Sequence, residues 1–352
     1  MTDNNPAQSQ PEETPKPVKP VKPKRDPRAK LYKPDHPLIL ASSPHFHVKD
    51  TVPTIMWNVI LALIPATVMA LIYFQWAAAG IILSSVLAAV VSEMIVNRIK
   101  GEAFTIPDGS AAITGLLLAL TLPPSFSIGG AVLGSVFAII IGKHVFGGLG
   151  YNIFNPALLG RAFLQASFPV PMTTWTWPLT ARYAEVDGIT AATPLGLFKF
   201  ETITSELPGL LTGNISGSLG ETSAIAILAG GIYLLIRKYA DWRIPLSFLG
   251  SVFLVSGVFW LVSPETYPTP VFQLFSGGLM LGAFFMATDM VTSPVTAKGA
   301  WIFGAGAGFL LVIIRLFGGL PEGVMYSILL LNALTPLINR YTRPKFFGEI
   351  RA

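Results

Sequence analysis

A threonine-rich stretch at 187–194, Asp-Gly-Ile-Thr-Ala-Ala-Thr-Pro, holds the side chains that are best suited to chemistry. Thr193 directly precedes a proline, which is typical of a helix N-cap followed by proline at the first helical position. The same hydroxyl could instead carry a phosphate-linked group, because the two alanines before it would let a modifying enzyme approach, and Asp187 could orient it. Thr190 is the nearest rival hydroxyl. The local sequence leaves capping and attachment both open.

The chain contains no cysteine and four histidines, which limits the redox centres that it could hold by itself. Disulfides, cysteine-ligated iron–sulfur clusters and thiolate zinc sites are excluded within this chain. Only His144 lies beside an apolar run, so we predict no bis-histidine haem and no metal site. No nicotinamide fingerprint follows a predicted strand, so no catalytic residue is assigned. An electron carrier here would need neither cysteine nor histidine ligands, and a flavin meets that condition.

Charged and aromatic side chains near apolar segments form a second set of candidates. Asp289 ends an interrupted apolar segment, where a carboxylate is costly unless it serves an ion path or caps a helix, and both interpretations stay open. Lys143 and Arg161 could extend to the membrane interface or contact a headgroup or cofactor phosphate, and the sequence favours the interface. For Trp175 and Trp177 it favours the outer interface over stacking on a cofactor.

The composition indicates that most of these residues lie in or beside a lipid bilayer. Hydrophobic residues make up 52% of the chain, charged residues 12%, and the mean hydropathy is +0.59. Soluble domains carry about 25% charged residues, and a transmembrane helix needs roughly 20 apolar residues. We therefore predict an all-α polytopic membrane protein with about ten transmembrane segments: 55–74, 77–96, 109–122, 128–146, 152–168, 222–237, 245–263, 273–288, 300–316 and 322–339. The third and eighth are expected to be interrupted helices.

Positive residues recur on one side of this arrangement, which predicts that both termini are cytoplasmic and that 169–220 lies outside the inner membrane. The net charge of +5 therefore indicates membrane topology, and no nucleic acid partner is predicted. The Pro/Lys-rich tail at 1–40 is expected to be disordered and cytoplasmic, and the short tail at 341–352 is also expected to be cytoplasmic. The positive clusters are Lys49 with the tail before it, Arg98 with Lys100, Arg237 with Lys238 and Arg243, and Arg340 with Arg343 and Lys345.

An internal repeat relates 41–168 to 221–340 at an offset of 171 residues. The Phe-Gly-Gly-Leu sequence at 146–149 recurs at 317–320, and Thr-Leu-Pro at 121–123 meets Thr-Ser-Pro at 292–294. Five segments in each half would make the second half inverted relative to the first. Inverted repeats with interrupted helices near the midplane are common in transporters.

Several of these motifs resemble the NqrB/RnfD family of membrane subunits. The stretch 190–193 is similar to the family's flavin-attachment motif, and 142–157, 220–223 and 287–294 match its other signatures. The resemblance covers about 38–345. It implies a fold similar to urea channels, with FMN joined to Thr193 by a phosphoester, Thr190 and Asp187 close to that bond, and Arg161 as a further cofactor-binding residue. A second flavin such as riboflavin is compatible with it.

The resemblance also implies a place in an Rnf complex with subunits A, B, C, E and G, which moves electrons between NADH and ferredoxin and couples this to Na⁺ or H⁺ translocation. Other expected partners are the lipid bilayer and a flavin transferase. Catalysis would belong to the complex, so whether this chain is itself an enzyme is left open. The alternative is a redox-inactive channel or secondary transporter on the same scaffold, and only the threonine motif separates the two.

Overall fold

The computed structural model describes residues 50–101, 105–178, 192–203, 205–221 and 223–344. The regular elements in these ranges are all helical, which confirms the predicted all-α class. The predicted N-terminal tail at 1–40 lies outside the described residues. The ten-segment count and the inverted repeat stay predictions.

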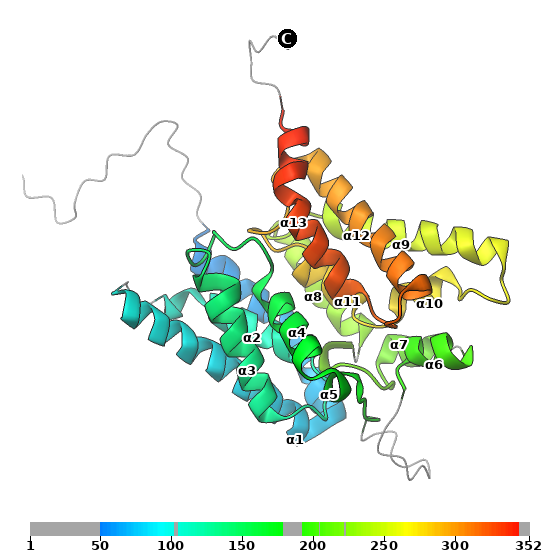
Figure 1. Ribbon diagram of the computed structural model, residues 1–352, viewed down its shortest axis with the longest axis horizontal. Helices are drawn as coiled ribbons and strands as arrows, with labels where there is room; N and C mark the ends of the chain where they lie inside the picture. The colour runs from blue at the N-terminus through cyan, green and yellow to red at the C-terminus, as the bar shows by residue number, and fades with distance from the viewer. Residues whose placement is uncertain (1–49, 102–104, 179–191, 204, 222, 345–352) are drawn as a thin grey trace, which may run out of the picture. The chain divides into compact units, whose positions relative to one another are not determined.

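The first part of the chain forms long and half-length helices that pack on one another (Figure 1). Their bounds are α1 (Val52–Lys100), the 3₁₀ turn η2 (Ile106–Asp108), α2 (Ser110–Leu120), α3 (Ile128–Ile139), the π-helical turn η3 (Ile140–His144) and α4 (Pro156–Ser167).

Short helices then lead into a second set of long ones. The connecting elements are α5 (Pro169–Thr173), α6 (Pro194–Glu201), α7 (Leu207–Thr212) and η5 (Leu219–Glu221). The second set comprises α8 (Ala224–Ile236), α9 (Arg243–Val262), α10 (Pro270–Phe275), α11 (Leu279–Leu281), the π-helical turn η6 (Gly282–Met286), α12 (Ala297–Phe317) and α13 (Val324–Thr342).

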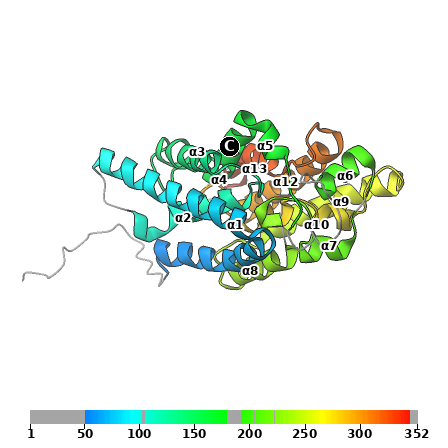
Figure 2. The same cartoon turned by 90° about the horizontal axis from the view of Figure 1, so that it is seen from below.

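Helix α1 doubles back midway along its 49 residues, as Figures 1 and 2 both show. Gln75 interrupts the helical backbone there with φ 48° and ψ −124°. The bend falls between the predicted segments 55–74 and 77–96, so both belong to one continuous element. The chain therefore reverses direction with almost no connecting loop.

The interrupted helices predicted at 109–122 and 273–288 are present as short pieces. Helix α2 has 11 residues, follows Gly109 in the left-handed region (φ 78°), and has its first amide, that of Ser110, bonded to Asp108 Oδ1 at 2.8 Å. The second interrupted region consists of α10, α11 and η6. Glycine adopts this left-handed conformation without steric cost, and the aspartate oxygen accepts from an amide that has no partner within the helix.

Among the described helices, α1, α9 and α12 are long and apolar enough to cross a membrane. The segments predicted at 152–168 and 222–237 are shorter than expected, because α4 and α8 have 12 and 13 residues. Helix α4 begins late because Asn155 caps it, accepting bonds from the amides of Ala157 and Leu158 at 3.0 and 3.4 Å. Each of these two helices therefore covers only part of the segment predicted for it.

Small residues allow the helix backbones to approach closely. A Cβ at Gly304 of α12 would collide with Ser247 Oγ of α9, and a Cβ at Gly308 would lie 2.6 Å from the Phe248 carbonyl. Elsewhere on α9, the large side chains of Leu254 and Leu261 are exposed. Small residues between helices and large apolar residues toward lipid are what a bilayer favours.

Candidate functional site

Thr193 forms the N-cap of α6. Its backbone is extended (φ −68°, ψ 158°), and its Oγ1 accepts a hydrogen bond from the Gly196 amide at 3.1 Å. Pro194 occupies the first helical position, where its missing N–H costs nothing. The capping geometry predicted from the sequence is therefore present. It uses one of the two lone pairs on the hydroxyl oxygen, so capping and attachment do not exclude each other.

Lys199 fastens α6 to the end of α12. Its Nζ donates to the carbonyls of Arg315 and Leu320, each at 3.1 Å, and to the carbonyl of Gly318. Carbonyls at a helix C-terminus are unsatisfied and attract cations. Partial burial lowers the pKa of Lys199 from its ordinary value. The contacts hold the helix that carries Thr193 against the 317–320 loop.

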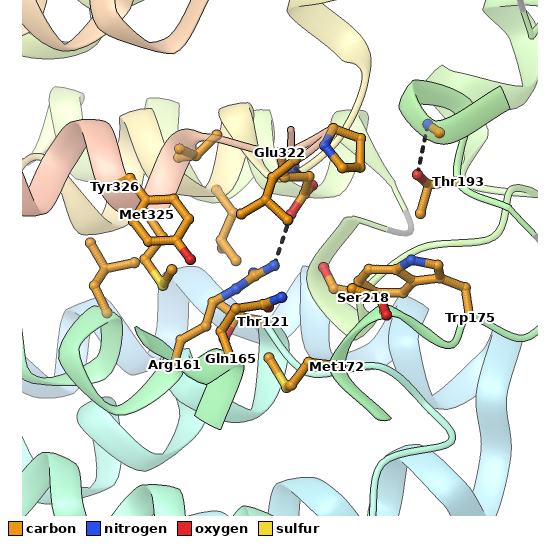
Figure 3. A pocket seen from close by; sticks show the side chains of 18 of the residues that line it. Thr121, Arg161, Gln165, Met172, Trp175, Thr193, Ser218, Glu322, Met325 and Tyr326 are labelled. Carbon is orange, nitrogen blue, oxygen red and sulfur yellow. Dashed lines mark hydrogen bonds and ion pairs between the residues drawn. The ribbon is translucent and has the colours of Figure 1, made fainter. Parts of the chain in front are cut away.

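Thr193 lies on the wall of a cavity of about 570 Å³, which we name the Thr193 cavity. Pockets for small molecules and cofactors commonly enclose roughly 300–1,000 Å³. Figure 3 shows lining side chains, several of which come from α4, α5 and the segment joining α12 to α13. The lining includes Thr121, Leu158, Arg161, Gln165, Met172, Trp175, Thr193, Phe200, Ser218, Glu322, Met325 and Tyr326.

One ion pair crosses this cavity wall. Arg161 Nη2 of α4 donates to Glu322 Oε2 at 2.8 Å, and Glu322 Oε1 accepts from the Gly278 amide at 3.0 Å (Figure 3). Arginine has five N–H donors. Glu322 is the only hydrogen-bond partner of the guanidinium among the described residues. Most of its donor capacity is therefore available to a ligand in the cavity.

Further buried polar groups lie around this ion pair. Ser218 Oγ and Glu221 Oε1 make no hydrogen bond of good geometry with the described residues, although Glu221 lies near both Ser218 and Glu322. Arg315 donates from Nη1 to the Gln273 carbonyl and Oε1 at 2.6 and 2.9 Å and from Nη2 to the Ser276 carbonyl at 2.8 Å, while its Nε has no partner among the described residues. Buried polar groups are normally paired, so unpaired ones beside a cavity call for a functional explanation.

Asp289 lies in the turn between η6 and α12, apart from Thr193. Its Oδ1 accepts from the Val291 amide at 3.4 Å and its Oδ2 from Thr292 Oγ1 at 3.1 Å. These hydrogen bonds stabilise the 289–292 turn rather than a helix end, because the N-cap of α12 is Thr296. Asp289 also lines a second cavity of about 100 Å³, together with Lys143 and Asn152. The space suits a few waters or an ion rather than a cofactor.

A polar group of five residues, of which all but Thr105 are buried, borders this second cavity, and we name it the Lys143 cluster. Lys143 Nζ donates to Glu93 Oε2 at 2.8 Å and to Ser110 Oγ at 2.6 Å. Glu93 Oε1 accepts from Thr105 Oγ1, which in turn accepts from Asn97 Nδ2 at 2.8 Å. The Lys143 side chain is 4% exposed. Its predicted extension to the membrane interface is therefore wrong, because Glu93 binds it inside the protein.

The structure brings Thr193 and Arg161 to the same cavity and keeps Asp289 away from it. Thr190 and Asp187 lie outside the described residues. Arg161 is bound by Glu322 beside the cavity, and its predicted extension to the membrane interface stays a prediction. Trp175 lines the cavity and is 8% exposed, whereas Trp177 is 39% exposed, and their predicted position at the outer interface stays a prediction.

Sequence reasoning missed Glu322 and Tyr326. Both follow the second Phe-Gly-Gly-Leu sequence, in the stretch Pro-Glu-Gly-Val-Met-Tyr at 321–326. A glutamate between proline and glycine at the start of an apolar segment was the available signal, because a carboxylate there is costly without a partner. Its partner, Arg161, is 161 positions away in the chain.

Comparison with known proteins gives a consistent result. The profile of the NQR2, RnfD, RnfE family matches residues 39–348. A relative from Clostridium ljungdahlii, the D subunit of a proton-translocating ferredoxin:NAD(+) oxidoreductase complex, is 47% identical over 322 residues, which cover 89% of this chain and 96% of the relative.

Two further relatives agree. The D subunit of the Na(+)-translocating ferredoxin:NAD(+) oxidoreductase complex of Acetobacterium woodii is 44% identical over 317 residues, with 88% of this chain and 95% of the relative covered. The D subunit of the ion-translocating oxidoreductase complex of Escherichia coli O17:K52:H18 is 40% identical over 349 residues, with 88% and 98% covered.

Proposed function

Because the chain belongs to the NQR2, RnfD, RnfE family, we propose that it is a D-type membrane subunit of an ion-translocating electron-transport complex and carries FMN on Thr193. The link is a phosphoester between Thr193 Oγ1 and the FMN phosphate. The observation that carries the proposal is the cavity of about 570 Å³ with Thr193 on its wall.

The residues around the cavity fit such a group. Arg161 has donors for flavin carbonyl or phosphate oxygens, and Trp175 and Tyr326 offer aromatic faces for a planar ring. FMN would supply electron transfer, and the chain would bind it, orient it and exclude water. Asp187 and Thr190 would assist the attachment reaction.

Thr193 is only 3% exposed. Since a flavin transferase must reach its hydroxyl, attachment would occur before α6 settles against the 317–320 loop or while it is released from that loop. The tether then keeps the cofactor in the cavity without a strong non-covalent affinity. A riboflavin in the second cavity gains no support, because about 100 Å³ is below the usual size of a ligand pocket.

Electrons would pass between NADH and ferredoxin through subunits A, B, C, E and G together with this chain. The relatives' names include both a proton-translocating and a Na(+)-translocating complex. The coupling ion of this chain is therefore either H⁺ or Na⁺. Catalysis belongs to the assembled complex.

The test of flavin attachment compares Thr193→Val with Thr190→Val in the full chain. Thr193→Val should abolish ultraviolet fluorescence of the denatured protein band, and Thr190→Val should retain at least part of it. Peptide mass spectrometry should place the FMN mass on Thr193. A fluorescent Thr193→Val band would contradict the assignment. A dark band from the unaltered chain, expressed with its transferase, would favour the redox-inactive channel.

Asp289 is proposed to take part in ion coupling, because its carboxylate lines the small second cavity, which is otherwise mostly apolar, as well as stabilising its own turn. Asp289→Asn removes the charge and keeps hydrogen-bonding capacity. Ions pumped per electron should fall more than electron transfer does, measured with the complex in sealed vesicles. An unchanged ratio would leave Asp289 with a role in its own turn alone.

We also propose ten crossings of the cytoplasmic membrane with both termini cytoplasmic, supported by the four positive clusters. A reporter that is active only outside the cell should give signal when fused near residue 205 and none when fused after 345. The reverse pattern would overturn this topology.

A further inference from the structure

The ion pair between Arg161 and Glu322 joins distant parts of the chain at the Thr193 cavity. Arg161 comes from α4, and Glu322 lies between α12 and α13. Their side chains are 11% and 15% exposed, so water screens their charges only in part. Both residues line the cavity. A charged group in that space would therefore experience a strong field from each.

Glu322 is fixed more firmly than Arg161. Its Oε1 accepts from the Gly278 amide at 3.0 Å, while its Oε2 holds the guanidinium. Gly277 has a φ of 68°, which favours glycine, and a Cβ placed on it would lie 2.7 Å from Glu322 Oε1, so a larger residue would displace the carboxylate. Arg315 is committed to carbonyls and does not line the cavity. Among the described residues that line the cavity, Arg161 is therefore the cation, and Glu322 positions it.

We propose that Arg161 and Glu322 together set the reduction potential of the flavin in this cavity. The inference rests on the proposed attachment at Thr193. An electron added to a flavin ring, from an external reductant or from another redox subunit, adds one negative charge unless a proton follows. Arg161 stabilises that charge and raises the potential. Glu322 opposes it and lowers the potential, while holding the guanidinium in place.

A purely structural role for the ion pair predicts different shifts of the midpoint potential. Removing either partner breaks the same bond, so a structural role predicts that both single variants shift the potential in the same direction or not at all. Electrostatic control predicts shifts of opposite sign, because the two variants remove opposite charges. It also predicts partial cancellation when both charges are removed together.

The experiment uses the full chain with its covalent flavin, purified from membranes, and follows flavin absorbance during an anaerobic redox titration. Arg161→Gln should lower the midpoint potential and Glu322→Gln should raise it. Each should change the reduced-to-oxidised ratio at a fixed potential by tenfold or more, which is about 59 mV for one electron. Arg161→Gln combined with Glu322→Gln should return toward the unaltered value, and Arg161→Lys should stay close to it.

The matched control is the pair Arg243 and Asp241, an ion pair at 3.2 Å with both side chains 35% exposed, whose residues do not line the cavity. Arg243→Gln and Asp241→Asn should leave the potential unchanged. Shifts of the same sign in Arg161→Gln and Glu322→Gln, or no shift in either, would overturn the inference. If the Arg161→Gln protein does not accumulate, the Glu322→Gln variant alone tests the inference. An unchanged or lower midpoint potential in that variant would then contradict it. A chain without covalent flavin would instead contradict the proposed attachment.

Discussion

The Thr193 cavity and the Lys143 cluster both contain a charged pair at 2.8 Å, yet they use hydrogen-bonding capacity in opposite ways. In the Lys143 cluster, each oxygen of Glu93 accepts a bond and the lysine also reaches Ser110. Beside the Thr193 cavity, Arg161 makes one bond and Ser218 Oγ makes none with the described residues. The adjoining spaces are about 100 and 570 Å³.

The difference separates a structural polar cluster from a ligand site. A buried charge pair whose bonds are all made within the protein mainly holds helices together. A pair beside a large cavity that leaves N–H donors without partners is partly desolvated but does not make all the hydrogen bonds it could. This is expected where a bound ligand accepts the remaining hydrogen bonds. Three pairs of substitutions test this comparison in terms of unfolding free energy.

Lys143→Met should have the largest effect. It leaves the Glu93 carboxylate buried without its cation, which costs about 3–5 kcal/mol. Adding Glu93→Leu should recover much of the loss, because no charge then remains unpaired. Denaturation in detergent, followed by helical circular dichroism, measures both. Arg161→Gln should lower the unfolding free energy by less, since Glu322 borders a cavity. An equal loss in the two variants would contradict the distinction between a structural cluster and a ligand site.

Ser110→Ala and Ser218→Ala form the next test. Ser110 Oγ accepts from Lys143 and donates to Asp108 Oδ1 at 2.7 Å. Losing bonds to two charged groups should cost about 1.5–3 kcal/mol. Ser218 Oγ has no described partner, so Ser218→Ala should stay within about 0.5 kcal/mol of the unaltered chain. A large cost for Ser218→Ala would mean that its hydroxyl serves the fold without a ligand.

Glycine substitutions should give the smallest effects. A Cβ at Gly115 would lie 2.7 Å from the Ser85 carbonyl, at the contact between α2 and α1 that brings Ser110 and Glu93 together. Gly115→Ala should therefore cost about 1–3 kcal/mol through overpacking. Gly319 lines the Thr193 cavity and has nothing within 4 Å of its Cβ position. Gly319→Ala should leave the unfolding free energy unchanged in the same denaturation assay. A loss as large as that of Gly115→Ala would contradict the open space at this position.

Features of the fold that depend on residues adjacent in the sequence could be predicted. Thr193 before Pro194 indicated the cap of α6, and Asp108 with Gly109 indicated the start of the short helix α2. The partners of charged residues depend on helix packing. Nothing local to Arg161 specifies Glu322, and Lys143 is 50 positions from Glu93. Both basic residues were therefore assigned to an interface, although each has a carboxylate inside the protein.

The reversal of α1 at Gln75 has a consequence for how this protein enters the bilayer. Backbone groups at such a bend lack helical partners and must remain at the water boundary rather than in hydrocarbon. Trp76 beside it is 87% exposed, and tryptophan favours the headgroup region. Because almost no loop joins the two arms, we expect 52–100 to insert as a hairpin whose tip lies at the membrane surface.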